Sequence, residues 1–414
     1  MVNYFYDCYV ILNKVYGEKQ FIKQAINDSF IEELNRPLTV KICYGVLDRD
    51  EELSFYIRQL AQKTPKLAVR TILKISMYMI KYLDKKDYFV VQNAVELTKK
   101  LGKGGMSGFV NAFLRKFVSS DIPLPKDTAE MLSVKYSYPL FMVKTLIGDY
   151  GVKRAENIMS SHYPDNTLCF YNTDGENYLS EKGIKHEKTP FDNVFTVKNF
   201  HRNYDYDIGV YTYQALGSVA ICNEVEPCDS LLDCCAAPGG KSIRLSYKVK
   251  TVTSWDIYPH RTELIKIYAD RMKRNNISIA VNDAKIPQEN LNKSFDAVLC
   301  DVPCSGSGVI GDDPDIKLNR TEQDVTSLIK EQQSILNSVC NYVKVGGYLY
   351  YSTCSIFYNE NYKNVENFIK THDNFIIEKI DSPLLHDDIN GTNCFLPDIS
   401  FGNGFYIAKL KRIK

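Results

Sequence analysis

The sequence predicts an α/β fold, in which a doubly wound, mostly parallel sheet follows an all-helical region and a small α+β subdomain. Three observations lead to this prediction. From residue 230 onward, short apolar runs alternate with helical stretches, which is typical of βαβ units. Before about residue 135, apolar residues recur every three or four positions, which indicates helices. Between these regions, short apolar runs are broken by Asn, Asp and Gly.

The amino-terminal periodicity is clearest in residues 69–80, where the apolar side chains fall on one helical face. Residues 38–53 and 89–101 show the same spacing. Pro123 and Pro125 then interrupt the pattern, because proline cannot continue a helix. We therefore expect an all-helical domain over residues 1–125.

The middle of the chain gives a mixed signal. Residues 126–158 have a helical pattern, whereas residues 169–197 contain short apolar runs that predict a small α+β unit. Residues 201–214 are rich in tyrosine and aspartate. We expect one small subdomain over residues 126–225, in which the tyrosines fill a core or stack on bases.

The carboxyl-terminal region, residues 226–414, is expected to hold the parallel sheet. Helices are predicted at residues 259–275 and 322–343, and a last antiparallel strand at residues 405–410. The remaining strands are predicted at residues 231–235, 252–256, 277–281, 297–301 and 348–352.

Composition sets limits on function. The chain has 414 residues, is 44% hydrophobic and 24% charged, and carries a formal net charge of +1. These values are ordinary for a soluble globular protein, so a nucleic-acid site would have to be a local basic face. No signal peptide or long apolar run is evident, and we expect a cytoplasmic protein that does not enter a membrane. The twelve cysteines are expected to be reduced, and none has zinc-site spacing, so no metal is expected.

A glycine loop follows the first predicted strand of the sheet. The run from Leu231 to Lys241 passes from an apolar strand through Ala-Ala-Pro-Gly-Gly into a predicted helix. Ligands of doubly wound folds bind at the carboxyl ends of strands, where glycine lets the backbone approach closely. The glycine spacing is not that of a phosphate-binding P-loop. Alone, the loop fits a tight structural turn equally well.

Acidic residues end or follow the next three strands. Asp256 lies about 20 residues after the glycine loop, where a nucleotide-binding fold presents a carboxylate to ribose hydroxyls. Asp283 and Asp301 follow the third and fourth strands. A single acid at a strand end is usually a turn former or helix cap. Three in succession, in register with the loop, favour a cofactor site.

Two cysteines also lie just past predicted strands. Cys304 stands in Asp-Val-Pro-Cys-Ser and Cys354 in Ser-Thr-Cys-Ser. A lone cysteine is usually an inert small apolar residue. These two are predicted at the functional edge of the sheet, together with Asp301.

Methylation of cytosine carbon-5 explains why two thiols and an acid would meet there. Addition of a thiolate to carbon-6 breaks the aromaticity and makes carbon-5 able to attack a methyl group. An acid can hold or protonate ring N3 as charge develops. A base must then remove the carbon-5 proton so that the thiol can leave, and a second cysteine could assist.

These motifs resemble the bacterial 16S ribosomal RNA cytosine-5 methyltransferases of the Sun/RsmB type, over nearly the whole chain. Residues 235–241 resemble their S-adenosylmethionine loop, and residues 301–305 their Asp-x-Pro-Cys-Ser motif. Residues 353–355 resemble the catalytic Thr-Cys-Ser. Residues 108–116 resemble part of the NusB-like RNA-binding domain that is fused to these enzymes. The combination in this order is highly specific.

The resemblance implies a class I, Rossmann-like methyltransferase domain. It also implies methylation of carbon-5 of a cytosine of 16S ribosomal RNA, as in the enzymes that methylate cytosine 967. It implies that Cys354 attacks carbon-6, that Cys304 assists release, and that Asp301 also faces the base. S-adenosyl-L-methionine is the implied cofactor, and a monomer is the default. The implied cofactor-binding residues are Cys235, Ala236, Ala237, Pro238, Gly239, Gly240, Lys241, Asp256, Asp283 and Asp301.

The chain departs from the family pattern after Gly308. Residues 311–313 read Gly-Asp-Asp where these enzymes usually carry basic residues, and Leu318 replaces a common aromatic residue. If the basic residues contact RNA phosphates, this chain would bind RNA differently there.

Three alternatives remain open from the sequence. The same chemistry could act on transfer RNA or another RNA. It could also act on DNA, although DNA cytosine methyltransferases attack with the cysteine of Pro-Cys and need no Thr-Cys-Ser. A non-catalytic RNA-binding assembly factor would fit the helical domain alone, but it would not require an intact glycine loop and both cysteines.

Overall fold

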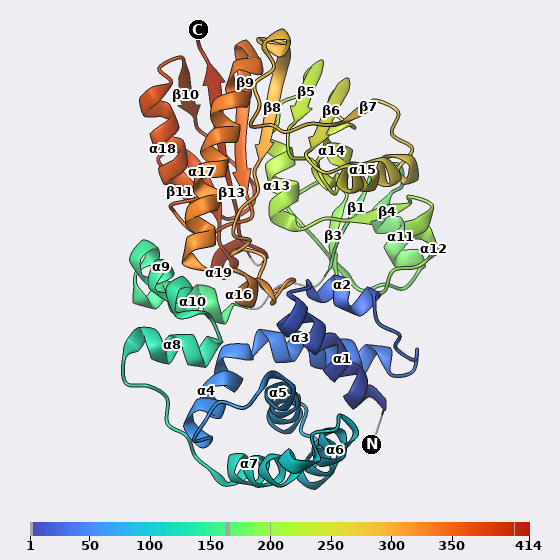
Figure 1. Cartoon of the computed structure of the whole chain (residues 1–414). Coiled ribbons are helices and arrows are strands. Elements are labelled where there is room, and N and C mark those ends of the chain that lie inside the picture. Colours follow the sequence, from blue (N-terminus) through green and yellow to red (C-terminus); the bar gives the residue numbers. More distant parts are fainter. Residues whose placement is uncertain (1–2, 162–165, 199, 401) are drawn as a thin grey trace. The chain divides into compact units, whose positions relative to one another are not determined.

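The computed structural model describes residues 3–161, 166–198, 200–400 and 402–414 (Figure 1). The chain divides into two compact units. The first runs to Met159 and includes Ile310–Thr321, and the second consists of Ser160–Val309 with Glu322–Lys414. Residues 310–321 thus belong to the first unit although the chain on either side belongs to the second. Within the described residues, no helix has the length and apolar character needed to span a membrane.

The first unit is all-helical, as the periodicity predicts. The long predicted helix at residues 69–80 lies inside α5, whose Val69, Ile72 and Leu73 are buried in the core of this unit. Its helices are α1 Asn3–Glu18, α2 Ile22–Asn27, α3 Arg36–Asp48, α4 Asp50–Leu60, α5 Leu67–Tyr82, α6 Asp87–Lys100, α7 Ser107–Ser119, α8 Thr128–Tyr136, α9 Leu140–Tyr150, α10 Val152–Ser160 and α16 Ile316–Asn319.

The periodic run at residues 38–53 forms two helices instead of one. The break is at Arg49, between α3 and α4. Ser137 Oγ, distant in sequence, accepts hydrogen bonds from the backbone N–H groups of Glu51 at 2.9 Å and Glu52 at 3.2 Å. These are two of the amides that a new helix leaves unsatisfied at its start. A tertiary contact therefore stabilises the break, and local periodicity does not reveal it.

The helical pattern at residues 126–158 is also divided. Ser137 has a left-handed backbone with φ of 57° and Gly151 has φ of 76°, and these positions end α8 and α9. Together with α10, these helices belong to the first unit, except for Ser160 at its boundary.

The small α+β unit is present within the second compact unit. Its antiparallel sheet has the strand order β2-β3-β1-β4. Tyr211 is fully buried among Phe170, Phe200 and Tyr206, so this tyrosine of the 201–214 tract fills a core. The elements are β1 Thr167–Phe170, α11 Gly175–Glu181, β2 His186–Lys188, β3 Val194–Val197, α12 Tyr204–Asp207 and β4 Tyr211–Tyr213.

A mixed sheet, nine-stranded within the described residues, forms the rest of the second unit. The strand order is β11-β12-β13-β9-β8-β5-β6-β7, and β10 pairs with β13. Strands β5 to β9 pair in parallel, whereas β13 pairs antiparallel with β9, as predicted. The elements are α13 Leu216–Glu224, β5 Ser230–Asp233, α14 Gly240–Leu245, β6 Thr251–Asp256, α15 Pro259–Arg271, β7 Ile277–Val281, β8 Phe295–Asp301, α17 Glu322–Val339, β9 Val343–Thr353, α18 Tyr362–Thr371, β10 Phe375–Glu378, β11 Asp387–Ile389, β12 Thr392–Phe395, α19 Pro397–Ser400 and β13 Phe405–Arg412.

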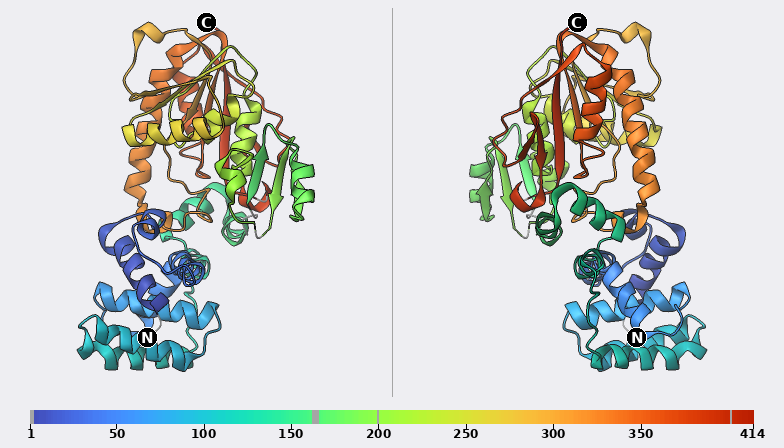
Figure 2. Two further views of the ribbon diagram at one scale, coloured as in Figure 1. Left: turned by 90° about the vertical axis from the view of Figure 1, so that its right-hand side faces the viewer. Right: turned by 90° about the vertical axis from the view of Figure 1, so that its left-hand side faces the viewer.

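Helices cover both faces of this sheet (Figure 2). Tyr350 and Tyr351 are neighbours on β9, so their side chains point to opposite faces. The Tyr350 hydroxyl accepts from the backbone N–H of Glu226, just after α13, at 3.1 Å. The Tyr351 hydroxyl accepts from Asn364 Nδ2 of α18 at 3.0 Å. The doubly wound, mainly parallel sheet predicted from the sequence is therefore confirmed.

Candidate active site

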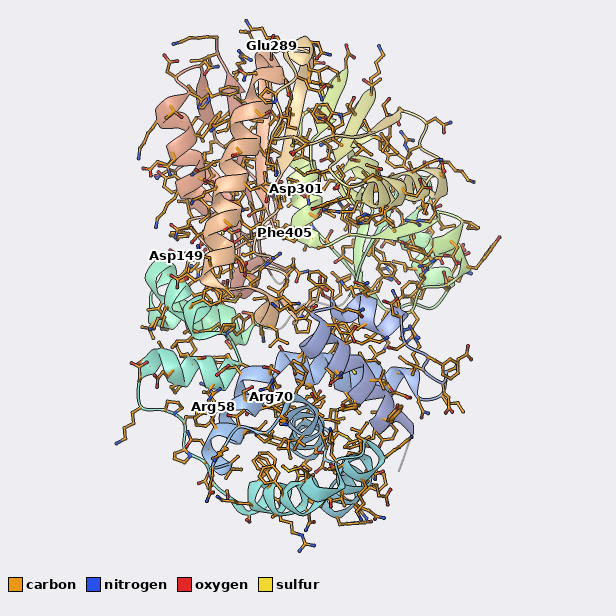
Figure 3. All side chains as sticks on the ribbon, in the orientation of Figure 1. Arg58, Arg70, Asp149, Glu289, Asp301 and Phe405 are labelled. Carbon is orange, nitrogen blue, oxygen red and sulfur yellow. The ribbon has the colours of Figure 1, made fainter. Side chains whose placement is uncertain are left out.

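A cavity of about 200 Å³ lies at the carboxyl ends of the parallel strands. Figure 3 labels Asp301 at this end of β8, away from Glu289. Seven of the residues singled out from the sequence line this cavity: Cys235, Ala237, Asp256, Asp283, Asp301, Cys304 and Cys354. Strands β5, β6, β8 and β9 end at the same edge because they run parallel, and this brings residues far apart in sequence to one place.

The other residues of the glycine loop shape this edge without lining the cavity: Ala236, Pro238, Gly239, Gly240 and Lys241. Gly239 has φ of 106°, which a residue with a side chain rarely adopts. Its N–H donates to the Ala236 carbonyl at 2.7 Å, and a Cβ there would lie 3.3 Å from Ile265 of α15. The loop thus needs glycine at this position for both its turn and its packing.

Asp256 lies on the cavity wall with an arginine that the sequence did not single out. Asp256 is 3% exposed, and its Oδ1 accepts from the Tyr258 N–H at 3.2 Å. The Arg261 guanidinium lies 3.4 Å from Asp256 Oδ2 and donates to the Ala237 carbonyl at 3.1 Å. Arg261 therefore ties the second strand end to the glycine loop. Arg261 lies in a predicted helix, and nothing in the sequence indicated that it would contact the glycine loop.

The residues after β7 complete the far wall of the cavity. Asp283 Oδ1 accepts from the Lys285 N–H at 3.0 Å, which is a local turn contact. Asn282 Oδ1 accepts from Gln288 Nε2 at 2.6 Å, whereas its buried Nδ2 has no hydrogen-bond partner among the described residues. A buried donor without a partner next to two carboxylates suits a polar ligand with hydroxyl groups and ring nitrogens.

Asp301 is held by partners on two other elements. Lys241 Nζ lies 2.6 Å from its Oδ2, and Ser352 Oγ of β9 donates to its Oδ1 at 2.7 Å. Burial lowers the pKa of Lys241, but the adjacent Asp301 carboxylate more than offsets this and raises it above the usual value. Lys241, which the sequence assigned to the cofactor loop, thus serves here as the cation beside Asp301.

Cys304 and Cys354 lie side by side, with their sulfur atoms 3.0 Å apart. Cys304 is buried and Cys354 is half-buried. The hydrogen bond with Cys354 is the largest cause that raises the pKa of Cys304 well above its usual value, and burial adds to it. At neutral pH Cys304 therefore keeps its proton, and its S–H can donate to the sulfur of Cys354.

The loop after Cys304 is also fastened to the loop of Cys354. The Gly308 N–H donates to the Cys354 carbonyl at 2.9 Å, and the Gly308 carbonyl accepts from the Gly404 N–H at 2.7 Å. A Cβ on Gly308 would lie 2.1 Å from the Gly404 carbonyl oxygen, so only glycine permits this approach.

Asp233, a buried acid at the end of β5, has a pKa far above its usual value. Asp233 ends β5 and accepts from Ser242 Oγ at 2.6 Å, and its Oδ1 has no partner among the described residues. The pKa of Asp233 is raised to about 7, mainly by burial. The Asp301 charge also raises it, whereas the Ser242 hydrogen bond and Lys241 partly offset the increase.

This raised pKa makes folding stability depend on pH. Between about pH 4 and pH 7 the folded protein binds a proton at Asp233 that the unfolded chain releases. The free energy of unfolding therefore falls as pH rises across this range, and the loss is complete above about pH 7. We expect Asp233→Asn to unfold less pH-dependently, with a gain of up to about 4 kcal/mol over wild type at about pH 8. Urea unfolding at about pH 5.5 and about pH 8 measures this. Asp229→Asn, an exposed acid before the same strand, is the control; parallel pH curves for wild type and Asp233→Asn would contradict the expectation.

The segment that departs from the family pattern is bound to helices of the first unit. Asp313 forms an ion pair with Lys23 at 2.6 Å, and Asp315 Oδ2 accepts from the Ile22 N–H at the start of α2 at 3.0 Å. Lys317 is buried, and its Nζ donates to the carbonyl of Asp48 at 3.0 Å and to its Oδ1 at 2.8 Å. Residues 313–317 therefore have structural partners within the protein, which the sequence did not indicate.

Lys317 is expected to stabilise the first unit. Its ammonium group satisfies the last carbonyl of α3 and lies 4.5 Å from the ring centre of Tyr138. We expect Lys317→Met to lower the free energy of unfolding by about 1–3 kcal/mol, because the part-buried carbonyl and carboxylate of Asp48 lose their donor. Lys23→Gln, which removes the exposed pair with Asp313, should cost less than about 1 kcal/mol. Chemical denaturation of both variants tests this, and equal effects would contradict the assignment.

Comparison with known proteins gives similarity over almost the whole chain. Residues 220–411 match the family model described as 16S rRNA methyltransferase RsmB/F, and residues 2–119 match the NusB family. The chain is 31% identical over 422 residues to a probable ribosomal RNA small subunit methyltransferase B of Bacillus subtilis (strain 168), covering 94% of each chain. It is 28% identical over 410 residues to ribosomal RNA small subunit methyltransferase B of Pasteurella multocida (strain Pm70), covering 91% of this chain and 88% of that protein.

Solved structures show the same fold. The crystal structure of PH0851 has a TM-score of 0.84 and 22% identity, covering 100% of this chain and 99% of that one. A methyltransferase homologue from Pyrococcus horikoshii has a TM-score of 0.60 and 20% identity, covering 70% of this chain and 100% of that one.

Proposed function

Because the chain belongs to the 16S rRNA methyltransferase RsmB/F family and is an S-adenosylmethionine-dependent RNA methyltransferase, we propose that it methylates carbon-5 of a cytosine in 16S ribosomal RNA. The reaction would pass through a covalent adduct between Cys354 and carbon-6 of the base. The observation that carries the proposal is the pair of sulfur atoms 3.0 Å apart in one cavity with Asp301.

In this proposal Cys354 supplies the nucleophile. Its thiolate would add to carbon-6 and move the ring electrons toward carbon-5. Carbon-5 would then bond to the methyl carbon, whose bond to the sulfonium sulfur breaks and leaves its electron pair on that sulfur. S-adenosylmethionine supplies the electrophilic methyl group. Asp301 would face N3, where charge develops, with Lys241 as its adjacent cation at 2.6 Å.

Cys304 would act in the release step. The carbon-5 proton must leave before the carbon-6–sulfur bond breaks and Cys354 departs as thiolate. The main cause of the raised pKa of Cys304 is its hydrogen bond with Cys354. In the adduct the Cys354 sulfur is bonded to carbon-6 and no longer forms this hydrogen bond, so the pKa of Cys304 should fall after attack. This makes Cys304 a better proton acceptor at the step that needs one.

The cofactor would bind along the glycine loop and the ends of β6 and β7. The carboxylates of Asp256 and Asp283 suit ribose hydroxyls and an amino group, and the unpartnered Asn282 Nδ2 suits a ring nitrogen. Asp301 would close the site on the side of the base. Residues 235–241 would supply the close backbone approach that the sequence predicts.

We also propose how the remaining parts contribute. Residues 1–125 would form the NusB-like RNA-binding domain, and residues 226–414 the methyltransferase domain. Residues 126–225 would serve RNA recognition, although those up to Met159 belong to the first compact unit and the others to the second. The protein would act as a monomer in the cytoplasm on the precursor of the small ribosomal subunit. Cytosine 967 of 16S ribosomal RNA is the proposed target base.

The test is methyl transfer from labelled S-adenosylmethionine to deproteinised 16S ribosomal RNA, followed by digestion to nucleosides and mapping of the modified base. Assembled small subunits, transfer RNA and DNA serve as parallel substrates. We expect 5-methylcytosine at one position of 16S ribosomal RNA. Product on transfer RNA or DNA alone would overturn the substrate assignment, and a methylated nucleoside other than 5-methylcytosine would overturn the chemistry.

A further inference from the structure

A single buried carboxylate contacts both cysteine loops. Glu360 is fully buried, in the turn before α18. Its Oε1 accepts from the Ser305 N–H at 2.7 Å and from Gln332 Nε2 of α17 at 3.0 Å. Its Oε2 accepts from Ser355 Oγ at 2.6 Å. Ser305 directly follows Cys304, and Ser355 directly follows Cys354.

The surrounding hydrogen bonds reinforce this arrangement. Ser355 Oγ lies 2.9 Å from Ser307 Oγ and 3.2 Å from Ser305 Oγ, so the two loops also contact each other through hydroxyls. The next residue, Asn361, accepts from Thr353 Oγ1 at 2.6 Å and donates to the Ser355 carbonyl at 2.8 Å. Both ends of the Thr-Cys-Ser motif are therefore held from the same turn.

Placing a carboxylate there is energetically expensive. Within the described residues, the hydrogen bonds of Glu360 come from an amide, a hydroxyl and a side-chain amide, with no Lys, Arg or His in an ion pair. A buried charge without a counter-ion is retained only when several donors satisfy it. Two of its three donors belong to the residues that follow the paired cysteines, which indicates a role at the site.

We propose that Glu360 is a positioning residue that fixes the Cys304 and Cys354 loops in one frame and so keeps the two sulfur atoms within reach of each other. The carboxylate acts through its length, because it must span from the Ser305 amide to the Ser355 hydroxyl. The role in catalysis rests on the proposed function, whereas the geometric role does not.

The geometric role can be tested without RNA or cofactor. Diamide, a diazene, takes one hydrogen from each thiol and becomes a hydrazine, while the two sulfur atoms form a disulfide. The rate at which the Cys304–Cys354 disulfide forms, followed by mass spectrometry, therefore reports how often the sulfur atoms meet. Wild type is expected to form it readily; no disulfide in the folded wild type would overturn the proposal.

Two substitutions distinguish the effect of the length of the Glu360 side chain from the effect of its charge. Glu360→Asp keeps the carboxylate but shortens it by one methylene, and should slow disulfide formation about tenfold to a hundredfold. Glu360→Gln keeps the length and removes the charge, and should slow it less. Tyr351→Phe is the matched control, since it removes a buried hydroxyl that donates to the Glu360 carbonyl at 2.6 Å and, among the described hydrogen bonds, makes none with either cysteine loop. A Glu360→Asp rate within about twofold of wild type would overturn the proposal.

A second variant covers the case in which Glu360→Asp does not fold. Ser355→Ala removes the Oε2 contact of Glu360, together with the contacts of Ser355 Oγ to the hydroxyls of Ser305 and Ser307, and leaves the Oε1 contacts in place. It should slow formation of the disulfide several-fold. An unchanged rate in Ser355→Ala would then count against the proposal. For catalysis, Glu360→Asp should lower kcat with little change in KM for RNA. If disulfide formation slows but methyl transfer does not, the geometry stands and the proposed catalytic use of the cysteine pair falls.

Discussion

Replacement of Cys354 by alanine is expected to lower methyl transfer by about four orders of magnitude or more, because it removes the atom that forms the covalent bond in the proposed mechanism. No route remains by which carbon-5 becomes nucleophilic. Binding of S-adenosylmethionine should change little, since the carboxylates that suit the cofactor lie at the end of β6 and just after β7. Single-turnover transfer with labelled cofactor, together with calorimetric cofactor titration, measures both effects.

A cysteine outside the cavity provides the matched control. Cys228 is half-buried like Cys354, and its Sγ contacts only the Ser230 carbonyl at 3.7 Å among the described hydrogen-bond partners. Cys228→Ala should retain most of the activity. Substantial methyl transfer by Cys354→Ala, combined with its loss in Cys304→Ala, would assign the attack to the Pro-Cys cysteine instead, as in DNA cytosine methyltransferases.

The strand ends of the catalytic unit could be predicted from the sequence because each strand is a short apolar run followed by an acid or a cysteine. Ile277–Val281 matches its predicted range, and β5 and β8 differ by a few residues at their ends. Once strands are parallel, their carboxyl ends share one edge. The meeting of Asp256, Asp301 and the two cysteines at one cavity follows from that rule.

Features that depend on tertiary contacts could not be predicted in this way. The helix break at Arg49 is stabilised by Ser137, which is far away in sequence. The predicted helix at 322–343 ends at Val339, because Val343 already pairs with Phe295 across a register shift in the sheet. Glu360 lies between two asparagines in a polar stretch that looks like an exposed loop. Its burial arises only when two strand-end loops fold over it.

Replacement of Cys304 by alanine is expected to trap the protein on its RNA. In the proposed mechanism, attack by Cys354 and methyl transfer can still proceed, but removal of the carbon-5 proton loses the base that we propose for it, so the adduct accumulates. Steady-state turnover should fall by about two to four orders of magnitude. Denaturing electrophoresis with labelled cofactor should show methyl label in a protein–RNA band that survives denaturation.

The pH behaviour of this release distinguishes a proton-accepting role from a merely structural one. If Cys304 accepts the proton, decay of the wild-type adduct should accelerate as pH rises, because a larger fraction of Cys304 is thiolate, and decay in Cys304→Ala should not follow that curve. The double variant Cys304→Ala/Cys354→Ala should form no band at any pH. A Cys304→Ala protein that turns over like wild type would show that another group removes the proton. In that case, the 3.0 Å contact between the sulfur atoms would serve only to donate a hydrogen bond to Cys354 before it attacks.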